Sequence, residues 1–327
     1  MAPRHKVTVL GGGMWGSVLA QHLANKNARV TLWEFFPAVA NSLKKTRRHA
    51  QIPGFRLNGA IKVTHDIAVA VKDADVLLFV LPSRALAATA KKIRGLGLRK
   101  TAVAVNASKG VEAHTFATMG DIISREIPAL RGKVWTLTGP SFAREVARGV
   151  PTCLMLGGPS GPHAKALVSL FNGGALNIRH WPDRHGVELG GSLKNAIAIG
   201  AGMLDGLGTG ANTKAALLVQ GLHEMSLLIR ARGGHAETIY GLSGLGDLIA
   251  TGTSPESRNR GFGEKLGKGL SPKRALSQIP TIVEGIEASA AAHELCLRNE
   301  VKAPLLEAIW RATRGAPAKV VLTALGF

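Results

Sequence analysis

A glycine-rich turn near the start of the chain constrains the fold more than any other feature. Residues 6–10 (KVTVL) form a short apolar run of the kind found in buried strands, and Gly11, Gly13 and Gly16 follow it directly. A helical pattern comes next, and a second apolar run spans residues 29–33. Strand, glycine turn, helix and strand within about 30 residues are typical of the opening unit of a doubly wound α/β sheet.

The spacing of these glycines predicts a dinucleotide-binding site. Gly11 permits the tight turn, Gly13 lets the backbone approach the pyrophosphate, and Gly16 lets the helix pack closely on the strand. The helix N-terminus then offers free N–H groups and the positive end of its dipole to the phosphates. Glu34 ends the next strand, where a carboxylate accepts hydrogen bonds from the adenosine ribose and repels a 2′-phosphate. We therefore expect NAD as the cofactor, with NADP less favoured.

The rest of the chain divides into a strand-rich part and a helix-rich part. Apolar residues make up 46% of the 327 residues, which is ample for a packed core. Strand-like runs alternate with helical patterns up to about residue 186, and only long helical patterns follow. This predicts a Rossmann-type doubly wound parallel sheet over residues 1–186 and an all-helical C-terminal domain over residues 187–327. Further strands are expected at residues 75–81, 101–106, 134–138 and 152–156, and helices at 214–231, 282–298 and 304–314.

Positive charge is concentrated in the first part of the chain. The net charge is +20, and residues 1–190 hold 26 Lys and Arg against 10 Asp and Glu, whereas residues 191–327 hold 15 against 11. A field of this sign attracts anionic ligands. The basic clusters lack the interleaved aromatic residues of a nucleic-acid groove, so no dedicated nucleic-acid or membrane partner is expected. Arg47 and Arg48, in one such cluster, remain candidates for contacting a cofactor phosphate.

The remaining composition favours a cytoplasmic protein without a metal site. Cys153 and Cys296 belong to no CxxC pair or zinc-ligand spacing. The N-terminus lacks the apolar run of a signal peptide, and Lys194 interrupts the best candidate for a membrane span.

Lys194 lies in a glycine-rich apolar run, residues 190–212, that reads as a buried helix. Burial of an ammonium group is costly, and burial lowers the pKa of lysines in general, which suits them to proton transfer near neutral pH. The alternative is a lysine that extends from a helix end to solvent.

Three further segments combine small and polar residues in the manner of ligand loops. They span residues 106–112, 139–145 and 242–248, the last followed by Thr251 and residues 257–260. Each alone is explained by turn chemistry. Together they supply lysines, an arginine and an aspartate, which suit an anionic, phosphorylated substrate.

These segments, in this order, resemble the NAD(P)-dependent sn-glycerol-3-phosphate dehydrogenase family over nearly the whole chain. The resemblance rests on VLGGGMWGSVLA, SKGVE, GPSFAREV, SLKNAIAIGAGMLDG, GLGDL and SRNRGFG. It implies an oxidoreductase that interconverts dihydroxyacetone phosphate and sn-glycerol 3-phosphate, supplies phospholipid synthesis and forms a homodimer.

The resemblance also assigns roles to individual residues. Lys194 is the implied general acid and base, with Lys109 and Asp247 completing the catalytic set. The implied substrate-binding residues are Lys109, Gly139, Ser141, Asn195, Asp247, Thr251, Ser257, Arg258 and Asn259. The implied cofactor-binding residues are Gly11, Gly13, Met14, Trp15, Gly16, Glu34, Lys109, Ala143, Arg258, Ile282 and Glu284.

Two departures from the family pattern and two alternative functions accompany this assignment. Met14 stands where many relatives carry serine, and Phe35 stands where NADP-using bacterial relatives tend to carry a basic residue, which again favours NAD. One alternative is a related Rossmann-plus-helical dehydrogenase that acts on a β-hydroxy acid or phosphogluconate. The other is a non-catalytic dinucleotide sensor.

Overall fold

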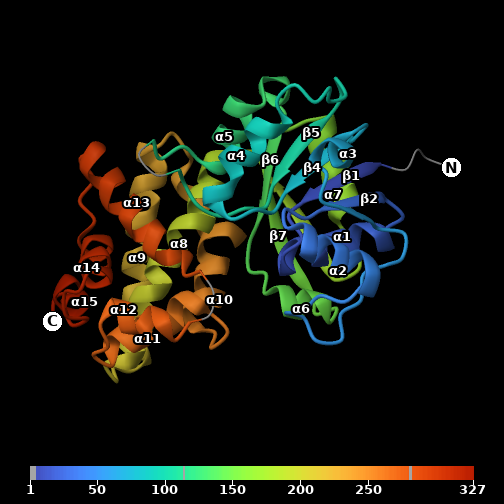
Figure 1. Cartoon of the computed structure of the whole chain (residues 1–327). Coiled ribbons are helices and arrows are strands. Elements are labelled where there is room, and N and C mark those ends of the chain that lie inside the picture. The colour runs from blue at the N-terminus through green and yellow to red at the C-terminus, as the bar shows by residue number, and fades with distance from the viewer. Residues whose placement is uncertain (1–4, 113–114, 280–281) are drawn as a thin grey trace. The chain divides into compact units, whose positions relative to one another are not determined.

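The computed structural model describes residues 5–112, 115–279 and 282–327. The chain forms two compact units (Figure 1). The first comprises the chain up to Glu112 together with Ala117–Arg184, and the second comprises the short segment ending at Phe116 together with His185–Phe327.

The first unit is built on an eight-stranded sheet with the order β3-β2-β1-β4-β5-β6-β7-β8. Neighbouring strands are parallel except β6 and β7, which are antiparallel, so the expected doubly wound sheet is mainly rather than wholly parallel. The strands are β1 (Lys6–Leu10), β2 (Arg29–Trp33), β3 (Lys62–Thr64), β4 (Val76–Phe79), β5 (Val103–Asn106), β6 (Val134–Thr138), β7 (Thr152–Gly157) and β8 (Leu176–Trp181).

Two of these strands were not expected from the sequence. β3 has three residues, too few to show a periodicity. β8 (LNIRHW) is an edge strand whose buried and exposed residues alternate at first, so it is not the continuous apolar run that marks a strand buried on both faces.

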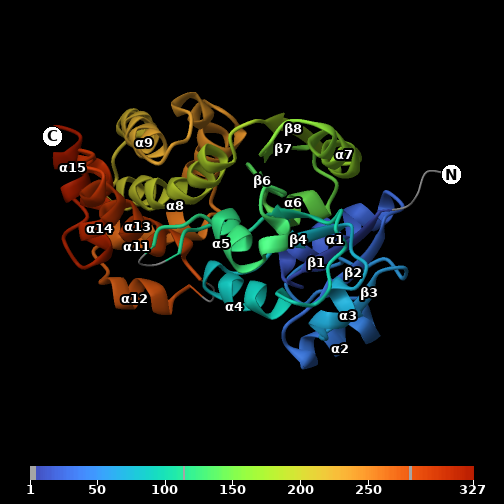
Figure 2. The same ribbon diagram turned by 90° about the horizontal axis from the view of Figure 1, so that it is seen from above.

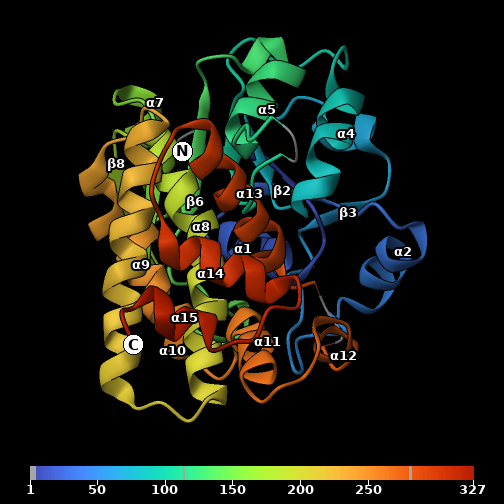
Figure 3. The same ribbon diagram turned by 90° about the vertical axis from the view of Figure 1, so that its left-hand side faces the viewer.

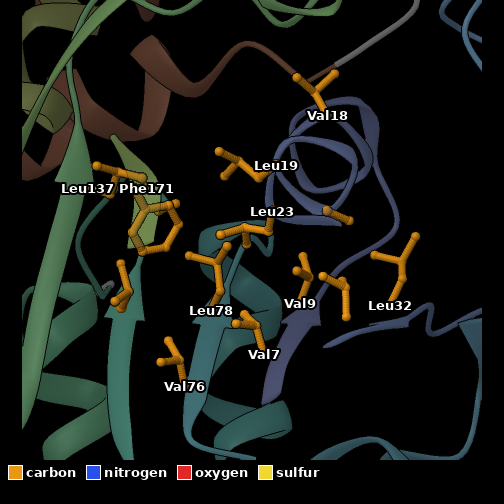
Figure 4. Packing of buried hydrophobic residues seen from close by; sticks show 14 of the residues in the cluster. Val7, Val9, Val18, Leu19, Leu23, Leu32, Val76, Leu78, Leu137 and Phe171 are labelled. Atoms are coloured by element: carbon orange, nitrogen blue, oxygen red, sulfur yellow. The ribbon is translucent and has the colours of Figure 1, made fainter. Parts of the chain in front are cut away.

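Helices cover both faces of the sheet. On one face, Leu19 and Leu23 of α1 (Met14–Asn25) and Phe171 of α7 (Pro162–Phe171) pack on Val9 and Leu78 (Figure 4). Successive strand residues point to opposite faces, so a second core forms on the other side. The other helical elements of this unit are α2 (Pro37–Thr46), α3 (Ile67–Val71), α4 (Ser83–Ile93), α5 (Met119–Glu126), η1 (Pro128–Leu130) and α6 (Ala143–Ala147), and α4 and α5 cover the second core.

The burial of His22 predicts that the stability of this unit depends on pH. His22 of α1 lies with Nε2 2.7 Å from the carbonyl oxygen of Phe171, and burial lowers the pKa of its imidazole, with Lys26 adding to the effect. The neutral ring is thus favoured in the folded state. The contribution of His22 to the free energy of unfolding is complete above the unfolded pKa of about 6.5 and is lost as the pH falls below that value. We expect the free energy of unfolding to fall by at most about 1.4 kcal/mol per pH unit from this group. Urea titrations between pH 7.5 and 5 should show a shallower fall for His22→Gln than for the wild type. An unchanged slope would contradict this, and His65→Gln, at an exposed position, is the control.

All the regular secondary structure among the described residues of the second unit is helical (Figures 2 and 3). At its centre, α8 (Arg184–Gly206) is buried from Gly186 to Leu204, as expected for a helix that is apolar on all sides. The other elements are α9 (Ala211–Ala231), η2 (Ala236–Tyr240), the π-helical turn η3 (Leu242–Gly246), α10 (Asp247–Thr253), α11 (Arg258–Gly267), α12 (Pro272–Ser277), α13 (Glu284–Arg298), α14 (Pro304–Thr313) and α15 (Val320–Ala324).

Glycines allow α11 to pack backbone to backbone on α8. A Cβ atom on Gly263 of α11 would lie 1.9 Å from the carbonyl oxygen of Ile199, and one on Gly202 of α8 would lie 1.9 Å from that of Arg260. Each helix repeats its glycine one turn later, at Gly267 and Gly206, with the same kind of contact. This packing sets where the first turn of α11 lies against α8.

Candidate active site

The glycine turn in the first unit has the conformation that the spacing predicts. Gly11 has φ +119°, and a Cβ atom there would lie 2.2 Å from the carbonyl oxygen of Val80. A Cβ on Gly16 would lie 1.9 Å from the carbonyl oxygen of Gly11, whereas Gly13, which precedes the first residue of α1, has open space around it. The turn is therefore closed on the strand side and open at the helix N-terminus, where a phosphate would bind.

Glu34 lies against this turn. Its Oε2 accepts a hydrogen bond from the backbone N–H of Gly12 at 3.0 Å, and its Oε1 accepts one from Phe36 at 3.0 Å. Glu34 is buried, with only 8% of its surface exposed. A fixed carboxylate beside an open helix N-terminus fits the ribose and phosphate groups of a dinucleotide.

His49, which no sequence pattern indicated, also lies at the turn. Its Nε2 is 3.2 Å from the carbonyl oxygen of Gly12, and burial lowers the pKa of its ring, an effect that the nearby Glu34 opposes. Met14 and Trp15, in the first turn of α1, are half-buried against the core of this unit.

Lys109 follows β5 in a loop that packs tightly. Gly110 has φ +129°, and a Cβ there would lie 2.8 Å from the Cβ of Ser83 at the start of α4. A hydrogen bond from the backbone N–H of Leu81 to Ser108 Oγ, at 2.8 Å, anchors this loop. Lys109 itself is half-buried.

The loop after β6 carries the other predicted residues of this unit. Gly139 has φ +145° and is buried, and the Ser141 hydroxyl donates to its carbonyl oxygen at 3.0 Å. Ala143 is half-buried and begins α6. The cofactor residues predicted in the N-terminal half thus lie on β1, β2, β5 and β6 or directly after them, at carboxyl ends of strands.

In the second unit, Lys194 is buried and paired, so the alternative of a lysine that extends to solvent is wrong. Its Nζ donates to Asp247 Oδ1 at 2.9 Å and to Thr251 Oγ1 at 2.5 Å. Thr251 Oγ1 in turn donates to Asp247 Oδ1 at 3.1 Å. These three residues are 4%, 3% and 6% exposed. The ammonium group is therefore held at a fixed position by a carboxylate and a hydroxyl on α10, which lowers the cost of burying it.

Asn195, next to Lys194 on α8, is tied to α11 and α13. Asn259 Nδ2 donates to Asn195 Oδ1 at 2.8 Å, and Asn259 Oδ1 accepts from the backbone N–H of Gly285 at 2.9 Å. A Cβ on Gly285 would lie 2.5 Å from the carbonyl oxygen of Asn195, so this approach requires glycine. Ile282 and Glu284 lie beside this contact at the start of α13, Ile282 exposed and Glu284 half-buried.

The first turn of α11 presents the remaining predicted residues. Ser257 is its N-cap and accepts a hydrogen bond from the backbone N–H of Arg260 at 3.2 Å. Arg258, the first residue of the helix, is exposed. An arginine at a helix N-terminus offers a charged fork and a favourable dipole to a phosphate.

Comparison with known proteins decides the family. Sequence models of the NAD-dependent glycerol-3-phosphate dehydrogenase N-terminus and C-terminus match residues 6–161 and 183–320. The chain belongs to this family.

Individual glycerol-3-phosphate dehydrogenases also match this chain over almost its entire length. This chain is 40% identical over 324 residues to the glycerol-3-phosphate dehydrogenase (NAD(P)+) of Moorella thermoacetica. The alignment covers 98% of this chain and 96% of the relative. The enzyme of Agathobacter rectalis is 37% identical over 322 residues, with 98% and 95% covered. The crystal structure of glycerol-3-phosphate dehydrogenase from Coxiella burnetii superposes with a TM-score of 0.92 at 31% identity, covering 99% of both chains.

Family membership makes the protein a nicotinamide-dependent oxidoreductase, and the two alternative functions are not favoured. No group of three or more His, Cys, Asp or Glu side chains in the described part of the chain could hold a metal ion. Nor does any helix in these ranges have the length and apolar character needed to cross a membrane.

Proposed function

We propose that this chain interconverts dihydroxyacetone phosphate and sn-glycerol 3-phosphate with NAD(H), using Lys194 as the general acid and base. The observation that carries the proposal is the buried Lys194 ammonium, held by Asp247 and Thr251 within the second, helical unit. When bound, the nicotinamide cofactor supplies the hydride that reduces the ketone carbon.

The chain's own residues have separate tasks in this proposal. Lys194 gives a proton to the ketone oxygen as it becomes an alkoxide, and takes one from the alcohol in the reverse direction. Asp247 and Thr251 hold Nζ at one position, so little reorganisation accompanies the proton transfer. Lys109 adds a second positive charge near the developing oxyanion.

Phosphate recognition falls to the first turn of α11. The phosphate binds to Ser257, Arg258 and Asn259. Asn195 binds the carbon chain of the substrate. Gly139 and Ser141 complete the substrate site, with Ala143, Met14, Trp15, Ile282 and Glu284 along the cofactor.

We infer that most cofactor contacts come from residues 1–186 and most substrate contacts from residues 187–327. We also infer a cytoplasmic homodimer that supplies glycerol 3-phosphate for phospholipid synthesis. Sedimentation of the purified protein tests the dimer.

The experiment that tests the function is the loss of NADH absorbance with dihydroxyacetone phosphate as the substrate, repeated with NADPH. Rapid oxidation of NADH supports the proposal. Absence of turnover by folded protein with either cofactor would reject it, and β-hydroxy acids would then be the next substrates to test.

Glu34 should set the choice between the two cofactors. In Glu34→Ala, the repulsion of a 2′-phosphate is removed, and we expect kcat/KM for NADPH relative to NADH to rise by about 10-fold or more, equivalent to about 1.4 kcal/mol. Asp73→Asn is the control, because it removes an exposed carboxylate of the same unit that pairs with Lys6. An unchanged ratio in Glu34→Ala would mean that Glu34 does not contact the ribose.

A further inference from the structure

Asp205, near the end of α8, joins three helices of the second unit through charge. Its Oδ1 pairs with the ammonium group of Lys214 on α9, and its Oδ2 lies 2.6 Å from Nε of Arg260 on α11. The Arg260 contact falls outside the angles of a directional hydrogen bond, so it acts as an ion pair. The side chains of Asp205, Lys214 and Arg260 are 15%, 20% and 17% exposed, which protects these pairs from much of the screening at a surface.

Arg260 belongs to the turn that carries the proposed phosphate-binding residues. It follows Arg258 and Asn259 in the first turn of α11. Besides the backbone packing at Gly202 and Gly263, two side-chain contacts fix this turn to α8, the Asn259–Asn195 hydrogen bond and the Arg260–Asp205 ion pair. Neither the sequence patterns nor the family resemblance assigns a role to Asp205.

The spacing along α8 explains why this second contact matters. Lys194 and Asp205 lie eleven residues apart on one continuous helix, a rise of about 16 Å. α8 thus carries the proton donor near its middle and the anchor for the α11 turn near its end. The ketone and the phosphate of the substrate are covalently linked, so the proton donor and the phosphate-binding turn must keep a constant separation.

We propose that Asp205 is a positioning residue that holds the phosphate-binding turn of α11 in register with Lys194. It acts through Arg260 and does not touch the substrate. The inference rests on the proposed function, because it assumes that Arg258 and Asn259 bind the phosphate.

The test compares a substrate that has a phosphate with one that lacks it. Asp205→Asn keeps the size of the side chain and removes its charge. We expect kcat/KM for dihydroxyacetone phosphate to fall about 10- to 100-fold, mainly through a higher KM, because remote binding groups misplaced by about 1 Å have effects of this size. Turnover of glycolaldehyde, a carbonyl compound without phosphate, should change less than about twofold. Parallel losses with both substrates would overturn the proposal, because they would indicate a general structural role.

A second readout uses inorganic phosphate as a competitive inhibitor and does not depend on glycolaldehyde activity. Its inhibition constant should rise by a similar factor in Asp205→Asn. An unchanged constant would overturn the proposal. Wild-type protein that fails to turn over dihydroxyacetone phosphate would instead reject the proposed function, so the two failures are distinguishable.

Two further variants test the route through Arg260. In an Arg260→Met background, Asp205→Asn should cause no further loss with dihydroxyacetone phosphate, because the pair acts as a unit. Additive losses would show that Asp205 acts by another route. Glu264→Gln removes the other carboxylate near Arg260, at 3.4 Å and 29% exposed, and should have a smaller effect than Asp205→Asn.

Discussion

Replacing Lys194 with alanine should lower kcat by about 10²- to 10⁴-fold while changing the KM for NADH less than about threefold. In the proposed mechanism, the variant loses the proton donor and the charge next to the developing oxyanion, both of which act mainly in the transition state. The cofactor-binding turn is on the other unit and keeps its own contacts. The measurement is steady-state NADH oxidation with dihydroxyacetone phosphate, together with direct titration of NADH binding.

Loss of the ammonium also leaves the Asp247 carboxylate buried without its cation, so the fold must be checked separately. Thermal unfolding and NADH affinity show whether Lys194→Ala is folded, and Thr251→Val provides a milder variant that keeps the ion pair. We expect a smaller loss of kcat in Thr251→Val than in Lys194→Ala. Lys273→Ala, at an exposed position of α12, is the matched control for loss of a lysine. A folded Lys194→Ala enzyme with kcat within about tenfold of the wild type would remove the assignment.

Gly263→Ala should destabilise the second unit by about 2–4 kcal/mol although it adds only one methyl group. The new Cβ would lie 1.9 Å from the carbonyl oxygen of Ile199, and a backbone atom cannot rotate away as a side chain can. α11 must therefore move away from α8, and the turn with Arg258 and Asn259 moves with it. Activity with dihydroxyacetone phosphate should fall together with the unfolding midpoint in urea.

Gly261 offers a matched control on the same helix. A Cβ there meets nothing within 4 Å, and alanine is favoured over glycine in a helix by about 1 kcal/mol. Gly261→Ala should therefore be neutral or stabilising. Equal effects of the two substitutions would show that helix propensity, rather than the contact with α8, determines the result.

Local patterns predicted the first unit well because its strands are continuous apolar runs and its glycines meet local backbone requirements. Gly11 has the positive φ that a tight turn after β1 requires, and β4, β5 and β6 are buried on both faces. β8 departed from this rule because it lies at the edge of the sheet. β7 pairs with β6 in the antiparallel direction. This change of direction depends on how the chain packs after β6, and no local sequence pattern predicts it.

The candidate active site was predicted only in part. A lysine in an apolar helix was a visible anomaly, and the order of the motifs identified the family. The geometry that supports the proposed role of Lys194 depends on Asp247 and Thr251, which lie 53 and 57 residues further along the chain. His49 at the glycine turn and Asp205 under the first turn of α11 carried no local signal.

The sequence by itself determined the dinucleotide turn, the change from a sheet-based to a helical part and membership of the dehydrogenase family. These follow from short-range properties: the period of apolar residues, the conformations open to glycine and the order of motifs. Only the tertiary structure decided which groups pair with Lys194, how Asn259 reaches Asn195 and how closely α11 approaches α8. The reason is that such contacts join residues distant along the chain, and their formation depends on the packing of whole helices rather than on the preferences of the residues that meet.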